Sequence, residues 1–213
     1  MGPQGSITAE PLHPVEIRVL GALHEKEITT PEYYPLTLNA LVNACNQKSN
    51  REPVVNYEEE LVQQALALLR HKGLAVRISG TGHRVEKYAH SLGDKLNLGR
   101  PEAAVLCVLM LRGPQTVGEV RGRTERMYEF TELEDVEHCL ESLAARRPEP
   151  LVVSLPRGRW GHLLGGVPDP GHAAPEAQMP APHSGEFEDR VAALEREVAE
   201  LKQTLESFRR QFE

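Results

Sequence analysis

Aromatic residues and cysteines are scarce in this chain of 213 residues. Only 5% of its residues are aromatic while 40% are hydrophobic, so any packed core depends on aliphatic side chains. The three cysteines, Cys45, Cys107 and Cys139, form an odd set without paired spacing, and each lies in an apolar stretch. This pattern excludes a disulfide framework and a cysteine-based zinc site, and it predicts that the cysteines act as small hydrophobic residues.

Long hydrophobic runs are also missing. The longest uninterrupted apolar run covers the nine residues from Ala103 to Leu111. That is less than half of the roughly 20 residues that a membrane-spanning helix needs. The first residues show no basic region followed by an apolar core and a small-residue cleavage site. We therefore expect a cytoplasmic protein without a membrane partner.

No part of the sequence has an excess of basic residues. The net charge is −7, and residues 169–213, with 5 basic and 10 acidic groups, carry −5 of it. Residues 1–99 and 100–168 are each close to neutral. Non-specific binding of nucleic acid requires a basic excess that displaces counterions. Any such binding must therefore come from local patches.

One pattern of apolar residues occurs twice. Its first copy predicts helices over 15–24 and 38–47, then a third helix with apolar residues at i, i+4 and i+7, and finally a β-hairpin with strands over 74–79 and 84–88. The apolar residues of that third helix are Val62, Leu66 and Leu69. Glycines at positions 80 and 82 suit the tight turn of the hairpin.

The second copy repeats this order. It predicts helices over 103–111 and 117–126 and a hairpin with strands over 151–155 and 159–164. Its third helix carries Val136, Leu140 and Leu143 at the same spacing. The pairs Thr116 with Glu119 and Thr131 with Glu134 match the capping box and mark two helix starts.

Three helices closed by a β-hairpin form the winged-helix plan. We therefore predict a mainly α fold with small β-hairpins (α+β), in which two tandem winged-helix domains precede a C-terminal coiled-coil helix. The expected parts are an N-terminal tail over 1–12, domains over 13–95 and 100–165, a linker rich in proline and glycine over 166–185, and the coiled-coil helix over 186–213.

A long motif covers residues 29–54 and reads Thr29-Thr-Pro-Glu-Tyr-Tyr-Pro-Leu-Thr-Leu-Asn-Ala-Leu-Val-Asn-Ala-Cys-Asn-Gln-Lys-Ser-Asn-Arg-Glu-Pro-Val54. Together with shorter pieces at 82–88, 111–116 and 126–130, it resembles the bacterial YceH family of unknown function over about residues 13–165. The resemblance implies a tandem winged-helix fold and no assigned activity. The linker and the C-terminal helix look like departures from a shorter family pattern.

The helix predicted over 38–47 carries asparagines on a face about 120° from its apolar stripe. Asparagine is a poor helix former, so this cost in stability needs a cause. In one interpretation the amides read adenine edges while Lys48 and Arg51 hold phosphates. In the other, the amides form a structural knot through bonds to the backbone. Both stay open for the candidate binding residues Asn39, Asn43, Asn46, Gln47, Lys48, Asn50 and Arg51.

The two third helices begin with carboxylates, which counts against standard base reading because this end normally enters the major groove. Their simpler role is to stabilise the helix dipole. The hairpins instead carry basic residues that could touch a nucleic-acid backbone, namely Arg77, Arg84 and Lys87 in the first and Arg157 and Arg159 in the second. We expect Arg121, Arg123 and Arg126 to form a solvated face with salt bridges to nearby glutamates.

Apolar residues in the C-terminal segment alternate spacings of four and three, as in a coiled coil. Valine at a and leucine at d in the central heptads favour two parallel strands. A lone amphipathic helix folding back onto its own domains is the alternative. The expected dimerisation residues are Val191, Leu194, Val198, Leu201, Leu205 and Phe208, and the expected partner is a second copy of the chain.

No motif for catalysis, metal binding or cofactor binding stands in a usable context, so we expect no enzyme, no cofactor and no metal site. The leading hypothesis is a non-enzymatic, homodimeric winged-helix protein that is DNA-binding or transcription-regulatory and uses residues 39–51 and the basic hairpins to bind nucleic acid. The alternative is an adaptor whose winged helices bind another protein and no nucleic acid.

Overall fold

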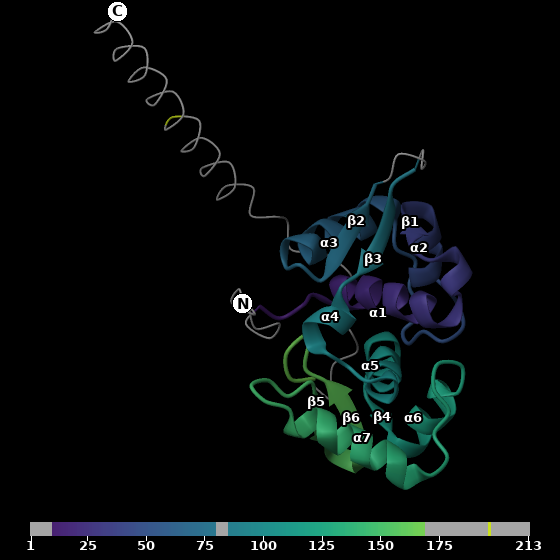
Figure 1. The fold of residues 1–213 in the computed structure, drawn as a ribbon, viewed down its shortest axis with the longest axis vertical. Helices are drawn as coiled ribbons and strands as arrows, with labels where there is room; N and C mark the ends of the chain where they lie inside the picture. Colours follow the sequence, from purple (N-terminus) through teal and green to yellow (C-terminus); the bar gives the residue numbers. More distant parts are fainter. Residues whose placement is uncertain (1–9, 80–84, 169–195, 197–213) are drawn as a thin grey trace, which may run out of the picture. The chain divides into compact units, whose positions relative to one another are not determined.

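A computed structural model describes residues 10–79 and 85–168 together with Arg196. The chain divides into two compact units, Met1–Ala177 and Gln178–Glu213, and the elements described below all belong to the first. They combine helices with two small antiparallel sheets, an α+β arrangement (Figure 1). Within the described residues, no helix is both long enough and apolar enough to cross a bilayer.

The first module, residues 14–90, has the order helix, strand, two helices, two strands. Its sheet is antiparallel in the order β1-β3-β2, and Val76 lies opposite Ala89 and Leu36 opposite Tyr88. The elements are α1 (Pro14–Thr29), the 3-10 helix η1 (Pro31–Tyr33), β1 (Leu36–Thr37), α2 (Leu38–Cys45), α3 (Glu59–His71), β2 (Ala75–Ile78) and β3 (Lys87–His90).

The second module, residues 100–162, repeats that order after the short helix α4 (Leu92–Leu96). Its antiparallel sheet has the order β4-β6-β5, with Gln115 opposite Trp160. The elements are α5 (Arg100–Arg112), β4 (Gln115–Thr116), α6 (Val117–Thr124), α7 (Leu133–Ala145), β5 (Val152–Leu155), the 3-10 turn η2 (Pro156–Gly158) and β6 (Arg159–His162).

Each long helix predicted from apolar periodicity between residues 13 and 165 is present, with ends that differ by a few residues, and the helix predicted over 186–213 lies outside the described residues. The capping box of Thr116 and Glu119 is confirmed, since each residue accepts a hydrogen bond from the other's backbone N–H. The predicted cap at Thr131 is wrong, because Glu132 is the N-cap of α7. Its backbone N–H donates a hydrogen bond to the Asp135 carboxylate. The two-residue strands β1 and β4 are too short to leave a periodic signal, and the sequence analysis missed them.

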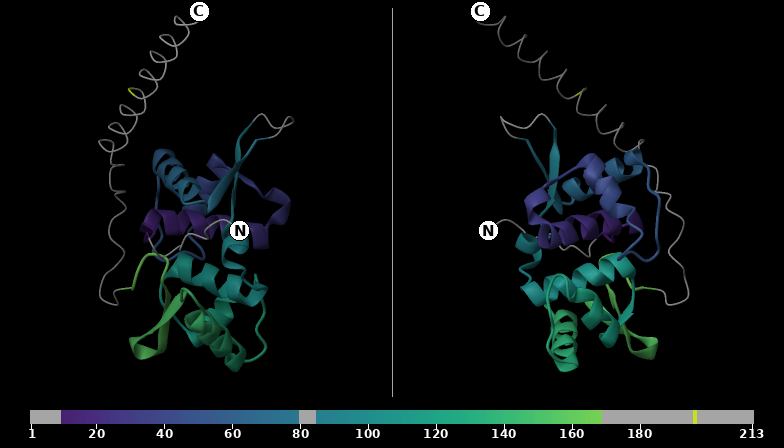
Figure 2. Two further views of the ribbon diagram at one scale, coloured as in Figure 1. Left: turned by 60° about the vertical axis from the view of Figure 1, so that its left-hand side comes forward. Right: turned by 90° about the vertical axis from the view of Figure 1, so that its right-hand side faces the viewer.

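Helices α1 and α5 join the two modules. They lie side by side in both views of Figure 2, and residues from Val15 to Leu23 and from Ala104 to Leu111 are buried, including the charged Glu16 and Arg18 of α1. The helices approach closely at Gly21, where an added Cβ would come within 3.1 Å of Met110 Cβ. The run from Ala104 to Leu111 of α5 is hydrophobic all round, and such a helix is buried on several sides by its neighbours. Here the neighbours include the other module.

The cysteines are free and buried, as their apolar surroundings predicted. Burial raises the pKa of the Cys45 and Cys139 thiols to about 12. Thiols protonated at neutral pH are poor nucleophiles and poor metal ligands, so these two act as packing residues.

Candidate functional site

The asparagine-rich segment follows β1 and includes α2. Thr37 caps the helix by accepting a hydrogen bond from the Ala40 N–H at 3.3 Å. The apolar side of α2 is buried, whereas Asn39 and Asn43 are exposed and joined by a hydrogen bond of 3.1 Å between their amides. Among the candidate binding residues of the segment, these two asparagines and Lys48 are the exposed ones.

Asn46 ties the end of α2 to the start of the following segment. Its amide nitrogen donates to the Tyr57 carbonyl at 2.8 Å, and its amide oxygen accepts from the Tyr57 N–H, also at 2.8 Å. Both ends of the amide are therefore engaged by backbone. These two hydrogen bonds match the structural interpretation of the asparagines. Because they use the amide donor and the amide acceptor together, Asn46 cannot also offer that pair to the edge of a base.

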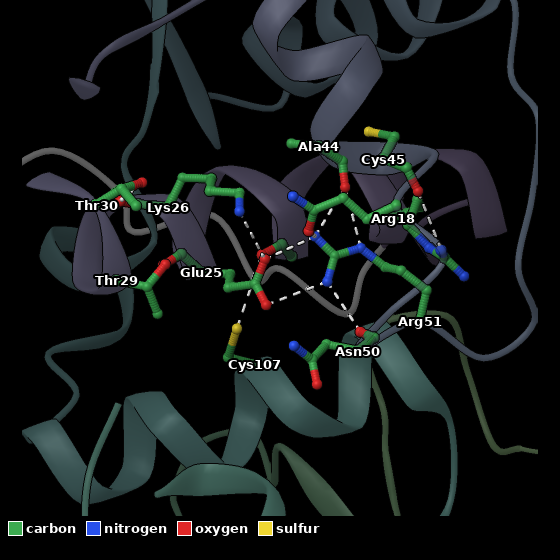
Figure 3. Close-up of polar contacts among 12 residues, drawn as sticks. Arg18, Glu25, Lys26, Thr29, Thr30, Ala44, Cys45, Asn50, Arg51 and Cys107 are labelled. Carbon is green, nitrogen blue, oxygen red and sulfur yellow. Dashed lines mark hydrogen bonds and ion pairs between the residues drawn. The ribbon is translucent and has the colours of Figure 1, made fainter. Parts of the chain in front are cut away.

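Arg51 lies in the interior, where the sequence analysis expected a phosphate-binding side chain. Its side chain has no exposed surface, and its guanidinium pairs with both carboxylate oxygens of Glu25 on α1, at 2.6 and 3.2 Å. It also donates to the Ala44 carbonyl and to the Gln47 side chain (Figure 3). In this conformation the guanidinium cannot contact a phosphate in solvent.

A second buried arginine completes the end of α2. Arg18 on α1 donates to the Cys45 carbonyl at 3.2 Å and to the Pro53 carbonyl at 2.7 Å. The last carbonyls of a helix have no partner within the helix. Arg18 and Arg51 therefore cap α2 at Cys45 and Ala44 from inside the protein, and the two side chains fix the end of the helix on α1.

Asn50 does not continue the helical face that the sequence predicted. The helix ends at Cys45, and Asn50 has a positive φ of 59°, a left-handed conformation that asparagine tolerates better than most residues. There its amide oxygen accepts from Arg112 of α5 at 2.6 Å. The segment therefore also contacts the second module.

The structure separates the candidate residues into two groups. Asn39, Asn43 and Lys48 are exposed, whereas Asn46, Gln47, Asn50 and Arg51 take part in contacts inside the protein. The exposed group keeps a surface role open. Burial of Arg51 removes the strongest phosphate-binding group from that surface.

The basic hairpin residues are more accessible. Arg77 on β2 is 45% exposed and pairs with Glu86 at 2.7 Å, and Lys87 is half-buried on the neighbouring strand. Arg84 lies outside the described residues. In the second module, Arg157 is exposed with a positive φ of 64°, and Arg159 donates to the Pro114 carbonyl at 2.7 Å. The two hairpins therefore present separate, partly neutralised charges.

The acidic residues of the third helices are exposed in both modules. They comprise Glu58, Glu59 and Glu60 at the start of α3, and Glu132, Glu134, Asp135, Glu137 and Glu141 on α7. Within the described parts of the chain, no ion pair within 4.0 Å joins any of them to a basic side chain. Their negative charge therefore faces solvent. The predicted dimerisation residues, Val191 to Phe208, lie outside the described residues.

The structure assembles one cluster that the sequence analysis missed, made by His24 and Glu27 of α1 and His90 of β3. One ligand atom from each lies within 4.8 Å of the other two. The two α1 residues are three apart, so they share a helical face, and that spacing is the signal that could have found them. His90 is distant in sequence and leaves no local pattern.

The hydrogen bonds of this cluster define the histidine tautomers. His24 Nε2 lies 3.1 Å from the Ala103 carbonyl and must donate, so His24 Nδ1 accepts from His90 Nε2 at 3.0 Å. His90 Nδ1 accepts from the Leu92 N–H at 3.1 Å, and its Nε2 also lies 2.9 Å from Glu27. A metal on His90 Nε2 would require a proton on Nδ1, directed at the Leu92 N–H. The contacts therefore fit a chain of neutral histidines better than a metal centre.

These elements and contacts define a mixed α+β protein with an acidic helix surface and a polar junction between two modules. Residues 12–160 match the family described as "Protein of unknown function, DUF480", and the chain belongs to this family. The resemblance to an uncharacterised bacterial family is confirmed at that level.

Three relatives, each called "UPF0502 protein", cover nearly the whole chain. The protein of Solibacter usitatus is 58% identical over 95% of this chain and 98% of its own length. The proteins of Opitutus terrae and Geotalea uraniireducens are each 50% identical, over 94% and 95% of this chain and 87% and 98% of their own lengths. At 95% coverage the similarity includes most of the segment after residue 165. The family model itself ends at residue 160 and does not include this segment.

Replacing Arg51 tests whether it is a structural residue. We expect Arg51→Gln to lower the free energy of unfolding by about 3–5 kcal/mol, because it leaves Glu25 as a buried charge without its partner. The exposed Lys48→Gln should change stability by less than about 0.5 kcal/mol. Urea unfolding followed by circular dichroism measures both. Similar small losses in the two variants would contradict the structural role.

His24 predicts a specific dependence of stability on pH. Burial, and then the neighbouring His90, lower the pKa of His24 from 6.5 to about 4, so between these pH values the folded protein binds fewer protons than the unfolded chain. Above pH 6.5 His24 is neutral in both states and does not lower the free energy of unfolding. As the pH falls from 6.5 towards 4, the unfolded chain takes up a proton that the folded protein does not, and the free energy of unfolding falls by about 2–3 kcal/mol.

The measurement is urea unfolding of wild type and His24→Gln across that pH range. Glutamine keeps an N–H donor for the Ala103 carbonyl but does not titrate, so the variant should lose less stability on acidification than wild type. His138→Gln, on the exposed side of α7, should follow wild type. Parallel profiles for wild type and His24→Gln would refute the assignment.

Proposed function

We propose that the two modules are winged-helix domains and that the protein is a non-enzymatic adaptor that binds a protein partner with a basic surface. The winged-helix assignment is supported by the order helix, strand, helix, helix, strand, strand, which occurs twice with equivalent sheet orders. In this fold the third helix, α3 or α7, is the element that normally meets a ligand.

The observation that carries the proposal is the exposed acidic face of α7. Glu134, Glu137 and Glu141 are spaced at i, i+3 and i+7 and therefore lie along one side of the helix. In a DNA groove this side would face phosphates, and no counterions would be released on binding. A surface with clustered lysine or arginine complements the same charges and gains association rate from them.

The asparagine-rich segment supports the same choice between the two hypotheses. Its five amides and Arg51 were the best candidates for reading bases and holding phosphates, and four of these six residues are engaged inside the protein. Nucleic-acid binding by the exposed Asn39, Asn43 and Lys48 with the hairpin arginines remains the competing function. The charge of α7 opposes it.

Charge reversal on α7 tests the adaptor proposal. We compare the proteins captured from a cell lysate by full-length wild type, Glu137→Lys/Glu141→Lys, and the matched control Glu125→Lys/Glu129→Lys, whose residues are exposed outside α7. A partner that uses α7 should bind wild type and control and bind the α7 variant at least about tenfold more weakly. Circular dichroism checks that all three chains fold.

Nucleic acid is the other arm of this experiment. Fluorescence anisotropy with a mixed-sequence DNA duplex should show no saturable binding by wild type, even at low salt. Saturable binding with a steep salt dependence that Arg77→Gln/Lys87→Gln removes would overturn the adaptor proposal in favour of DNA binding. Equal capture of every partner by wild type and the α7 variant would also overturn it.

We further propose that the chain forms a parallel homodimer through the heptads of residues 186–213. The strict alternation of four and three and the placement of valine and leucine support this assembly. Attractive pairs between chains, Arg190 with Glu195 and Glu197 with Lys202, favour the parallel orientation.

Light scattering of the full-length chain measures the dimer. Wild type should have twice the 23.7 kDa mass of one chain. Leu194→Glu/Leu201→Glu should reduce it to one chain, because charged residues enter two d positions of the seam. The control Ala192→Glu/Ala199→Glu adds the same charge at outward b positions and should remain dimeric. A single-chain mass for wild type would exclude the coiled coil.

A further inference from the structure

A small, partly open hollow lies between the two modules. Its walls come from α1, from the loop after α2, and from α5, α6 and the turn that follows α6. Three arginines of the second module, Arg112, Arg123 and Arg126, line it together with Asn50 of the first. Arg123 and Arg126 of the arginine cluster thus lie beside Asn50 of the asparagine-rich segment.

The sequence analysis expected these arginines to be solvated and paired with glutamates, and the structure bears this out only in part. Arg123 lies 3.6 Å from Glu119 and 3.9 Å from Glu52. Its Nη1 atom is nevertheless buried, and no atom in the described parts of the chain accepts a hydrogen bond from it. A buried donor of this kind is costly and calls for an acceptor.

The remaining charges leave the hollow positive. Glu25 lines it too, but its carboxylate is held by Arg51 at 2.6 Å and lies 3.7 Å from Lys26. Arg112 is half-buried, and its hydrogen bond goes to the neutral amide of Asn50. Burial, and then the charge of Arg123, lower the pKa of Arg112. The two guanidinium groups therefore repel each other in a partly desolvated place, and the charges of Glu25, the exposed Glu52 and Glu119 offset this repulsion in part.

An oxyanion would relieve both problems. Guanidinium groups present fixed pairs of donors that match the oxygens of phosphate, and their hydrogen bonds to it are charge-assisted. A dianion would offset the repulsion and accept from Arg123 Nη1. The hollow is far smaller than the pockets that enclose a whole ligand, so only a small anion such as a phosphate group would suit it, and a complete nucleotide would not.

We propose that this hollow binds the phosphate group of a small molecule, with Arg112, Arg123 and Arg126 as its donors. The site is separate from the acidic face of α7 and does not depend on the adaptor function. Because it is lined by both modules, bound phosphate stabilises their junction, and the midpoint of unfolding rises with its concentration.

Binding of inorganic phosphate by the full-length protein is measured by thermal shift and by isothermal calorimetry, with ionic strength kept constant by chloride. Wild type should bind saturably and become more heat-stable. Arg123→Gln and Arg126→Gln should each weaken binding by about tenfold or more. The control Arg100→Gln removes an exposed arginine at the other end of α5, about 18 Å away along the helix, and should bind like wild type.

Binding of adenosine monophosphate distinguishes a phosphate group carried by an organic molecule from free inorganic phosphate. If it binds with the same dependence on Arg123 and Arg126, the site takes the phosphate of an organic molecule, and if only inorganic phosphate binds, it takes the free anion. Lack of saturable phosphate binding by wild type would overturn the proposal, as would equal weakening in all three variants. Arg126 is exposed, so its variant keeps the test decisive even if Arg123→Gln fails to fold.

Discussion

The pair between Glu25 and Arg51 is the interaction on which the centre of this protein depends. A carboxylate and a guanidinium that are both withdrawn from water are stable together only when the geometry is close and further hydrogen bonds satisfy the remaining donors. Arg51 meets both conditions, because it binds Glu25 through two nitrogens and uses its other donors on the end of α2. The pair thereby attaches α2 to α1, which is the most buried helix of the first module.

The same pair explains the conformation of the neighbouring residue. Once Arg51 points inward, the chain must turn before it, and Asn50 takes the left-handed conformation at that turn. Its amide then faces α5 and accepts from Arg112. The position of Arg51 in the first module thereby determines a contact with the second module, which Asn50 makes. The hollow with its three arginines lies beside this contact.

The spacing of apolar residues predicted most of the helices of the fold. Val62, Leu66 and Leu69, or Val136, Leu140 and Leu143, lie on one side of a helix, and all six are buried as their spacing predicts. The strands β1 and β4 could not be predicted in this way, since two residues form no period, and they exist through pairing with distant strands. The coiled-coil prediction depends on the same kind of pattern but concerns residues outside the described part of the chain.

The candidate site was harder to predict, for a different physical reason. The asparagines of α2 lower its helix propensity, and the sequence indicated correctly that they have some compensating role. It did not distinguish the two interpretations of that role, because both used the same residues. The choice depends on the contact between Arg51 and Glu25, which are 26 residues apart, and the separate histidine cluster depends in the same way on His24 and His90, which are 66 residues apart. No local spacing in the sequence records either contact. A buried arginine and a phosphate-binding arginine look identical in a sequence, because the partner that distinguishes them is distant along the chain.

The carboxylates of this protein fall into two kinds with different effects. The carboxylates of α7 are exposed and separated from the basic side chains of the described residues, so their field extends into solvent and acts on approaching molecules. The carboxylate of Glu25 is neutralised where it lies, so it contributes structure and almost no field. The arginines of the hollow are the reverse case, because their positive charge is partly enclosed and incompletely neutralised. A basic partner at α7 and an anion at the junction would therefore use opposite charges at separate places, and neither would need to displace the other.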